Sequence, residues 1–167
     1  VHMSRGLGDV YKRQSLYKNL EKVEIFACGT SWNASLIGKH LLEQLAGIST
    51  TVSYASEARY APCPLRENTL IIGVTQSGET ADTLAALGME QQRRLDKAVN
   101  FTSRFLGITN RVESSITNLV DEVIDIRAGI EIGVAATKTF IAQVMVFYFL
   151  AIDLAWQRQY GLSLIHI

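Results

Sequence analysis

Short, mostly apolar runs alternate along this chain with longer stretches in which apolar residues recur at helical spacing. Val23–Cys28, Thr69–Thr75 and Phe105–Thr109 are the clearest runs; Thr50–Ser53 is weaker, and Val123–Ile126 is the last. Strands that are apolar on both faces and alternate with helices are typical of a parallel sheet covered on both sides. The pattern predicts an α/β protein, a three-layer α/β/α sandwich with a mostly five-stranded parallel sheet and right-handed crossovers.

The helical stretches predict three helices between and after these strands. The first begins near Asn33 and ends at Gly47, where a glycine is suited to the C′ position. The second runs from Glu79 to Arg94, and the closing helix runs from about Ala135 to Gln159. Between the second and third strands, Pro62-Cys63-Pro64 excludes regular structure.

The most apolar part of the chain, Phe140–Leu154, lies in the closing helix and contains Gln143 and Asp153. It falls short of the uninterrupted run of about 20 residues that a membrane span needs. We therefore expect a buried helix and no membrane partner. Within it, Phe147-Tyr148-Phe149 is expected to belong to the core.

Composition excludes several classes of function. The 167 residues suffice for one domain, and 16 basic against 16 acidic residues give no excess of positive charge for binding nucleic acid. Cys28 and Cys63 are too few for a disulfide framework and have no zinc spacing. His40 has no Asp, Cys or second His at a useful spacing. We expect no metal, no cofactor and a reducing, cytoplasmic location.

The two ends of the chain are related to each other through their coding DNA. A DNA sequence that encodes Asp9–Gln14 has a reverse complement that encodes Leu162–Ile167. This relation is typical of a sequencing adapter on both sides of an insert. We therefore expect residues 1–14 and 162–167 to be adapter-derived tails, residues 15–161 to be the domain, and the domain to be part of a longer protein.

Two polar loops follow predicted strands where a ligand would bind in such a sheet. In the first, Gly29-Thr30-Ser31 brings two hydroxyls and backbone N–H groups to the start of a helix, which favours an anion. Thr30 or Ser31 acting only as a helix cap is the ordinary alternative, and this loop alone does not exclude it.

The second loop favours the anion over the cap. Thr75-Gln76-Ser77-Gly78-Glu79-Thr80 contains three hydroxyls, an amide and a glycine, whereas a single cap needs one hydroxyl. Glu79 is expected to stabilise the first turn of its own helix by capping or through the helix dipole. Neither loop matches a nucleotide-binding motif, so we expect a phosphate carried by a smaller molecule. Lys138 is expected to be exposed or paired.

Four motifs in this chain resemble one known family. They are Ala27–Ser31 (A-C-G-T-S), Ala55–Tyr60 (A-S-E-x-R-Y), Gln76–Thr83 (Q-S-G-E-T-A-D-T) and Glu131–Lys138 (E-I-G-V-A-x-T-K). Together they resemble the first sugar isomerase (SIS) domain of the glutamine:fructose-6-phosphate aminotransferases, the glucosamine-6-phosphate synthases. The resemblance covers Lys22–Trp156. The S-G-E-T element is shared across SIS domains, whereas the other motifs together are specific to the synthases.

The resemblance implies a flavodoxin-like SIS fold and a site for fructose 6-phosphate or glucosamine 6-phosphate. The positions that hold the phosphate group in the family are matched by Ser31, Thr75, Gln76, Ser77 and Thr80. Thr30 and the backbone of Val134 match positions near the sugar. The family often has serine at Thr75, which keeps the hydroxyl, and at Ala136, which loses it. We leave Ala136 out of the site for that reason.

The resemblance also implies a reaction and a division of labour. The family transfers ammonia from glutamine to fructose 6-phosphate and isomerises the product to glucosamine 6-phosphate, for UDP-GlcNAc biosynthesis. Glutamine hydrolysis belongs to an N-terminal domain, the isomerisation base to a second SIS domain, and the Schiff-base lysine to the C-terminal tail. We expect no catalytic residue in this chain, inactivity of the chain alone, and a homodimer.

Two other functions would use the same phosphate cradle. A stand-alone SIS aldose–ketose isomerase would need its own base, for which the single His40 and no matching Glu motif give little support. A phosphosugar-sensing regulatory domain would need a DNA-binding segment, which neither residues 1–21 nor the charge balance provides.

Overall fold

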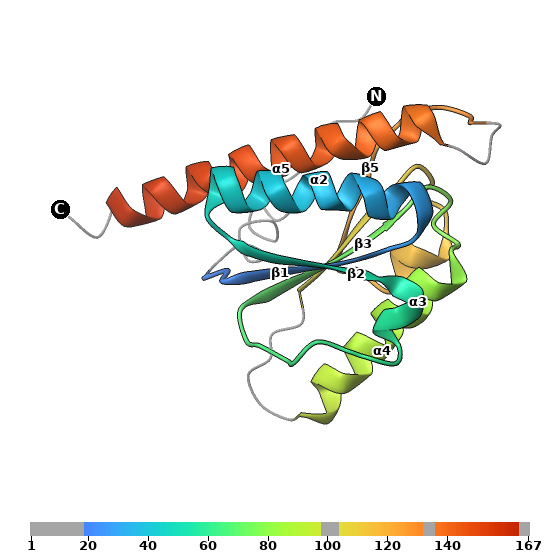
Figure 1. Cartoon of the computed structure of the whole chain (residues 1–167), viewed down its shortest axis with the longest axis horizontal. Coiled ribbons are helices and arrows are strands. Elements are labelled where there is room, and N and C mark those ends of the chain that lie inside the picture. The colour runs from blue at the N-terminus through green and yellow to red at the C-terminus, as the bar shows by residue number, and fades with distance from the viewer. Residues whose placement is uncertain (1–18, 98–103, 132–135, 164–167) are drawn as a thin grey trace.

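The structure is a computed structural model that describes residues 19–97, 104–131 and 136–163. In it, a five-stranded sheet lies between two layers of helices (Figure 1). The strands are β1 (Lys22–Ala27), β2 (Ser49–Tyr54), β3 (Thr69–Thr75), β4 (Arg104–Thr109) and β5 (Glu122–Asp125). The helices are α2 (Gly29–Ala46), α3 (Ala55–Ala58), α4 (Ala81–Asp96), α5 (Thr137–Ser163) and the short 3₁₀ helix η1 (Ser115–Asn118). The predicted three-layer α/β/α class is confirmed.

The order of strands in the sheet is β2-β1-β3-β4-β5, and every pair is parallel. The strand order reverses between β1 and β3, which are neighbours although β2 lies between them in the chain. Their register pairs Ala27 with Val74, so the residues that follow the two strands leave the same edge of the sheet side by side. Crevices at such reversals are where open α/β sheets bind ligands.

Both faces of the sheet are buried, which explains the apolar strands. In β1, Val23 and Ile25 belong to a core cluster that also contains residues of α2 and α5. Phe26 points to the other face and joins a cluster with residues of α3 and α4. In the central strand β3 all seven residues are buried. The two clusters are the two interfaces of the sandwich (Figure 1).

The first helix differs from its prediction at its start but not at its end. It begins at Gly29 rather than near Asn33, directly after the N-cap residue Cys28. It ends at Gly47, whose φ of 62° is left-handed and whose N–H donates to the carbonyl of Leu42, as predicted. The buried face of α2 is rich in small residues, namely Ser31, Ala34, Ser35, Gly38 and Ala46 beside Leu42.

Small residues in α2 allow α5 to pack closely against it. A Cβ atom added at Gly38 would lie 2.4 Å from Cγ of Phe147, a distance that real Cβ contacts do not show. Phe147 is fully buried, in agreement with the prediction for the closing helix. The predicted start of that helix, Ala135, lies outside the described residues.

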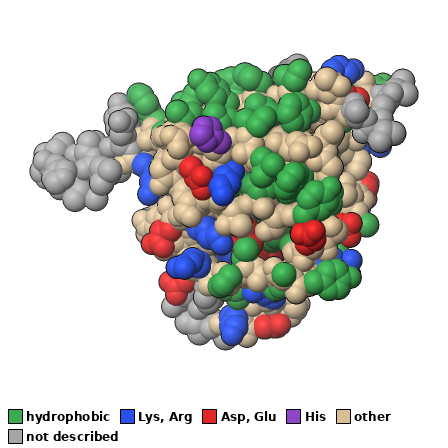
Figure 2. Space-filling model, in the orientation of Figure 1, with side chains coloured by type: hydrophobic (Ala, Val, Ile, Leu, Met, Phe, Trp, Pro, Cys, Tyr) green, Lys and Arg blue, Asp and Glu red, His purple; other side chains and the backbone are tan. Residues whose placement is uncertain are grey.

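The prediction that the closing helix is buried is correct for one face only. Tyr148 and Phe149, predicted to be core, are 43% and 63% exposed, because they point away from α2 and the sheet. The space-filling view shows apolar side chains gathered over the region where α2 and α5 lie (Figure 2). The exposed apolar residues of α5 are Ile141, Met145, Tyr148, Phe149, Ile152 and Trp156.

By length and composition alone, α5 over Thr137–Arg158 is apolar enough to cross a membrane. Its contacts are those of a domain helix, because Phe147, Leu150 and Leu154 are buried in the core cluster that covers the sheet.

Two short elements were not predicted. The four residues of α3 and the four of η1 are too few to show a helical period in sequence. The proline-containing segment after α3 is irregular, as predicted, and α4 holds it in place. Arg93 donates to the carbonyl of Cys63 at 2.9 Å, and Arg94 donates to the carbonyl of Arg66 at 3.2 Å.

Candidate functional site

The two predicted loops meet at the edge of the sheet where the strand order reverses. The first, Gly29-Thr30-Ser31, forms the first turn of α2 directly after β1 and Cys28. The second, Gln76–Thr80, joins β3 to α4. Because β1 and β3 are hydrogen-bonded neighbours in parallel, both helix N-termini are directed to the same edge. Gly29 has a φ of 57° and nothing within 4 Å of an added Cβ, so the space beside its Cα is open.

Neither helix is capped by its own N-cap side chain, and of the first-turn N–H groups of α2 the N–H of Gly29 donates to the Tyr54 hydroxyl at 3.2 Å. The N-cap residue of α2 is Cys28 and that of α4 is Thr80, and neither makes a side-chain capping bond. The interpretation that Thr30 or Ser31 only caps the first helix is therefore not supported. Uncapped N–H groups and the positive ends of two helix dipoles favour an anion at this edge.

The hydroxyls of the second loop are hydrogen-bonded in a way that leaves protons available. Thr75 Oγ1 and Thr80 Oγ1 are 2.7 Å apart, so one of the pair donates to the other and the second proton remains free. Ser77 Oγ accepts from the backbone N–H of Glu79 at 3.1 Å, which leaves the Ser77 proton free. The loop therefore presents hydroxyl groups whose free protons can be donated to an anion.

Ser31 of the first loop is held in a similar way from across the fold. Its Oγ accepts from Nε2 of Gln143 in α5 at 3.0 Å, and its own proton remains free to donate. Ser31 is 6% exposed and Gln143 is 1% exposed. This bond could not be predicted from the sequence, because the partners are 112 residues apart.

Glu79 does not lie in the first turn of its own helix and does not cap it, contrary to prediction. It lies outside α4, and its carboxylate accepts from the backbone N–H of Ser115 at 2.7 Å and from Ser115 Oγ at 2.6 Å. The hydrogen bond from the Ser115 hydroxyl, with that from the Ser115 N–H, lowers the pKa of the Glu79 carboxyl. Glu79 thus ties the second loop to η1.

Gly78 makes this contact between the loop and η1 possible. Its φ is 71°, and an added Cβ would lie 1.8 Å from Ser114 Oγ and 2.5 Å from Ser114 Cβ. The carbonyl of Gly78 accepts from the N–H of Ile116 at 3.1 Å. Only glycine combines this conformation with so close a neighbour.

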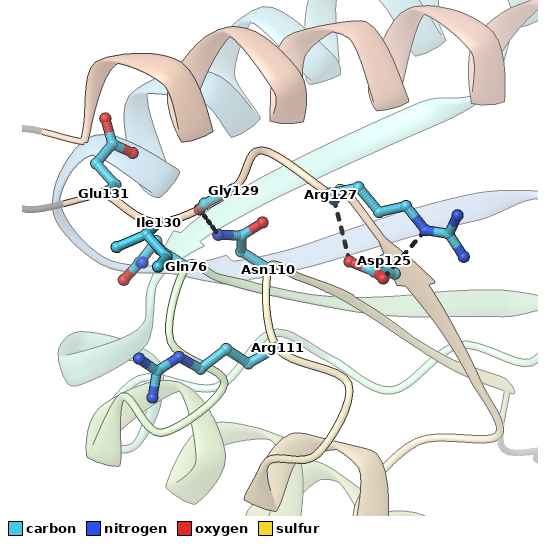
Figure 3. A pocket seen from close by; sticks show the side chains of 8 residues that line it. All are labelled: Gln76, Asn110, Arg111, Asp125, Arg127, Gly129, Ile130 and Glu131. Atoms are coloured by element: carbon cyan, nitrogen blue, oxygen red, sulfur yellow. Dashed lines mark hydrogen bonds and ion pairs between the residues drawn. The ribbon is translucent and has the colours of Figure 1, made fainter.

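A pocket of about 370 Å³ opens beside the second loop, at the ends of β3, β4 and β5 (Figure 3). Asn110 forms one wall: its Nδ2 donates to the carbonyl of Gly129 at 2.7 Å, and its Oδ1 accepts from the N–H of Ala128 at 2.8 Å. The N–H of Asn110 donates to the carbonyl of Gln76 at 3.1 Å. The lining residues are Gln76, Asn110, Arg111, Asp125, Arg127, Gly129, Ile130 and Glu131.

Comparison with known proteins agrees with this geometry. The family profile described as SIS domain matches residues 16–153. The chain belongs to the SIS domain family. A "Glutamine--fructose-6-phosphate aminotransferase [isomerizing]" from a Nostoc species is 67% identical over 147 residues, which are 87% of this chain and 23% of the relative. The Synechocystis protein of the same name is 65% identical, over 89% of this chain and 24% of the relative.

A solved structure is similar over most of the SIS domain. It is the C-terminal domain of glucosamine-fructose-6-phosphate aminotransferase from Francisella tularensis, with a TM-score of 0.74 and 33% identity. The match covers 90% of this chain and 40% of that one. The chain spans about a quarter of the length of the two curated relatives.

Most of the predicted binding residues of the SIS domain lie together. Thr30 and Ser31 lie on the first loop and Thr75, Gln76, Ser77 and Thr80 on the second, at the same edge of the sheet. Val134, predicted near the sugar, lies outside the described residues. Sequence reasoning missed Asn110 and Arg111, although they follow β4 directly and so belong to the same edge. Their position directly after a predicted strand could have indicated that they belong to the site.

Glu131, which precedes α5, is bonded to the first turn of that helix. Glu131 accepts from the backbone N–H groups of Lys138 at 2.9 Å and Thr139 at 3.0 Å, and also from the Thr139 hydroxyl. The bond from the Thr139 hydroxyl, with those from the backbone, lowers the pKa of the Glu131 carboxyl. Lys138 is exposed, as predicted, and its Nζ donates to the carbonyl of Ile130 at 2.8 Å.

The histidine and the two cysteines considered in the sequence analysis lie outside the two loops. His40 is exposed on α2. Cys28 and Cys63 are free thiols, and burial, followed by the nearby Glu24 carboxylate, raises the pKa of the Cys63 thiol. In the ranges 19–97, 104–131 and 136–163 no group of three His, Cys, Asp or Glu side chains is arranged to hold a metal ion.

Proposed function

We propose that this chain is the first SIS domain of a glutamine:fructose-6-phosphate aminotransferase and that it binds the phosphate group of fructose 6-phosphate or glucosamine 6-phosphate. The hydroxyls of Ser31, Thr75, Ser77 and Thr80 and the amide of Gln76 form the phosphate cradle. Thr30 and Val134 contribute on the side of the sugar. The observation that carries the proposal is the meeting of two helix N-termini, whose N-cap side chains make no capping bond, with hydroxyls that keep free protons.

The geometry suits a phosphomonoester better than other anions. Such a group carries several oxygens that each accept hydrogen bonds, and the cradle offers donors from two separate loops. At least one proton each comes from Ser31, Ser77 and the Thr75–Thr80 pair. A single carboxylate would leave part of this set without a partner. The high identity to aminotransferases named for fructose 6-phosphate supports this sugar.

In the complete protein, the domain would take part in amino sugar biosynthesis and, through it, in the supply of UDP-GlcNAc. The whole enzyme would transfer ammonia from glutamine to fructose 6-phosphate and release glutamate and glucosamine 6-phosphate. This domain would hold the phosphate while a glutaminase domain and a second SIS domain of the same chain carry out the chemistry. We propose a homodimer in the cytoplasm, in keeping with the family.

The test is the effect of fructose 6-phosphate on the melting temperature. Ligand at about 100 times its Kd should raise the melting temperature by roughly 5–10 °C, because it binds only the native state. The double variant Ser77→Ala/Thr80→Ala should lose the shift, measured against its own melting temperature without ligand. Ser49→Ala/Thr51→Ala, at the opposite edge of the sheet, is the matched control and should keep it. An undiminished shift in the Ser77/Thr80 variant would refute the cradle.

A further inference from the structure

The phosphate cradle contains no charged side chain. Its side-chain donors are hydroxyls and the amide of Gln76, which are all neutral, whereas a phosphomonoester carries about −1.5 to −2 charges at pH 7. The two helix dipoles offset part of this charge, and each is equivalent to only about half an elementary charge. A cation beside the cradle would therefore strengthen phosphate binding, and two arginines, Arg111 and Arg127, line the adjacent pocket.

Arg111 lies in that pocket next to the second loop. It is the second residue after β4, and the preceding Asn110 is hydrogen-bonded to the carbonyl of Gln76. Its own backbone is fixed: the N–H donates to Thr109 Oγ1 at 3.2 Å, and the carbonyl accepts from the Ser114 hydroxyl. The side chain leaves this rigid backbone and extends on the side of Gln76 (Figure 3).

The acidic groups near Arg111 are already engaged. Asp125 forms an ion pair with Arg127 at 3.4 Å and also accepts from the backbone N–H of Arg127 at 3.0 Å. Glu131 accepts from the first turn of α5. Glu79 accepts two hydrogen bonds from Ser115, which lower the pKa of its carboxyl, and the positive charge of Arg111 lowers that pKa slightly further.

The guanidinium of Arg111 keeps its charge available. Within the described part of the chain, its side chain has no ion pair within 4.0 Å and no hydrogen bond. Because its backbone is fixed, the guanidinium can reach only the space near the second loop, where it offers a planar pair of N–H donors to phosphate oxygens.

We propose that Arg111 is a further substrate-binding residue, whose guanidinium contacts the phosphate group of the sugar phosphate held by the cradle. The inference rests on the proposed function and adds to it the source of positive charge. It makes the site selective for the dianionic phosphate ester over the neutral sugar.

The test compares Arg111→Gln, Arg111→Lys and the control Arg127→Gln in calorimetric titrations of the full chain with fructose 6-phosphate and with inorganic phosphate. Arg127 lines the same pocket and is the matched control, because its side chain is 86% exposed and already paired with Asp125. Arg111→Gln should weaken binding about five- to tenfold, Arg111→Lys less, and Arg127→Gln less than twofold. Affinity should also fall less steeply with added salt in Arg111→Gln than in the unmodified chain.

The possible results distinguish a wrong role for Arg111 from a wrong phosphate cradle. Unchanged affinity in Arg111→Gln, with clear binding by the unmodified chain, would overturn the role of Arg111 and leave the cradle intact. Weaker binding with an unchanged salt dependence would also overturn it, since the variant would then act through the shape of the loop. Failure of the unmodified chain to bind fructose 6-phosphate would overturn both the inference and the proposed function.

Discussion

The contact between Gly78 and Ser114 allows the stability of the site to be tested with a single methyl group. Gly78→Ala places a Cβ 1.8 Å from Ser114 Oγ and 2.5 Å from Ser114 Cβ, in a residue whose φ is 71°. The left-handed conformation costs a non-glycine residue about 1–2 kcal/mol, and forced overlap in a packed region costs about 1–3 kcal/mol. We expect a loss of about 2–5 kcal/mol in the free energy of unfolding.

The assay is urea unfolding followed by circular dichroism. The midpoint should fall while the slope with denaturant stays unchanged, because the native state is destabilised and the surface exposed on unfolding is the same. Gly88→Ala is the matched control: Gly88 lies inside α4 with nothing within 4 Å of an added Cβ. That variant should gain up to about 1 kcal/mol from helix propensity.

A second variant separates the two causes. Ser114→Gly removes the two closest of the three atoms that the new Cβ would meet and leaves Thr109 Oγ1 at 3.2 Å, so in the double variant mainly the conformational cost should remain. The two substitutions should then be non-additive, with a coupling energy of about 1–3 kcal/mol that offsets part of the loss. Additive effects, or a Gly78→Ala variant as stable as the original chain, would refute the close contact.

Two further predictions concern α5. Gly38→Ala should destabilise the protein by about 1–3 kcal/mol in the same urea assay, because its Cβ would lie 2.4 Å from Cγ of Phe147. A Gly38→Ala variant as stable as Gly88→Ala would contradict the close packing of α2 against α5. Glu131→Gln should lower the melting temperature at pH 7, because the ionised carboxylate accepts the N–H groups at the start of α5. Since its pKa is lowered in the folded state, this stabilisation is present above the unfolded pKa of about 4.3 and is lost as pH falls through the folded pKa. Melting curves from pH 7 to pH 3 should show that the difference in melting temperature between the unmodified chain and Glu131→Gln disappears in acid. Glu113→Gln is the control and should leave the melting temperature almost unchanged. A difference that stays constant with pH would contradict the role of Glu131 in capping α5.

The sequence predicted the sheet well because the strands carry their own signal. Residues of β3 are buried on both faces, and the predicted range Thr69–Thr75 agrees with the observed strand. The end of α2 was also predictable, since Gly47 adopts the left-handed conformation for which glycine is suited. Such features depend on a residue and its near neighbours.

What the sequence did not predict depends on contacts between distant segments. Glu79 looked like a residue of its own helix, but its partner Ser115 is 36 positions away and draws it outside α4. Phe149 has the same apolar character as Phe147, and only the position of α2 decides which of them is buried. The site was predicted as two loops, whereas the pocket beside them needed the fold to bring Asn110 to Gln76.

The register that pairs Ala27 with Val74 also determines when the site can exist during folding. The two loops belong to strands that are adjacent in space but separated in the chain by β2 and α3. Closing that long connection costs chain entropy before any contact between β1 and β3 is gained. A partly folded chain in which one strand has formed without the other therefore holds half a cradle at most. The proposed binding of a phosphate ester therefore requires that β1 and β3 have paired.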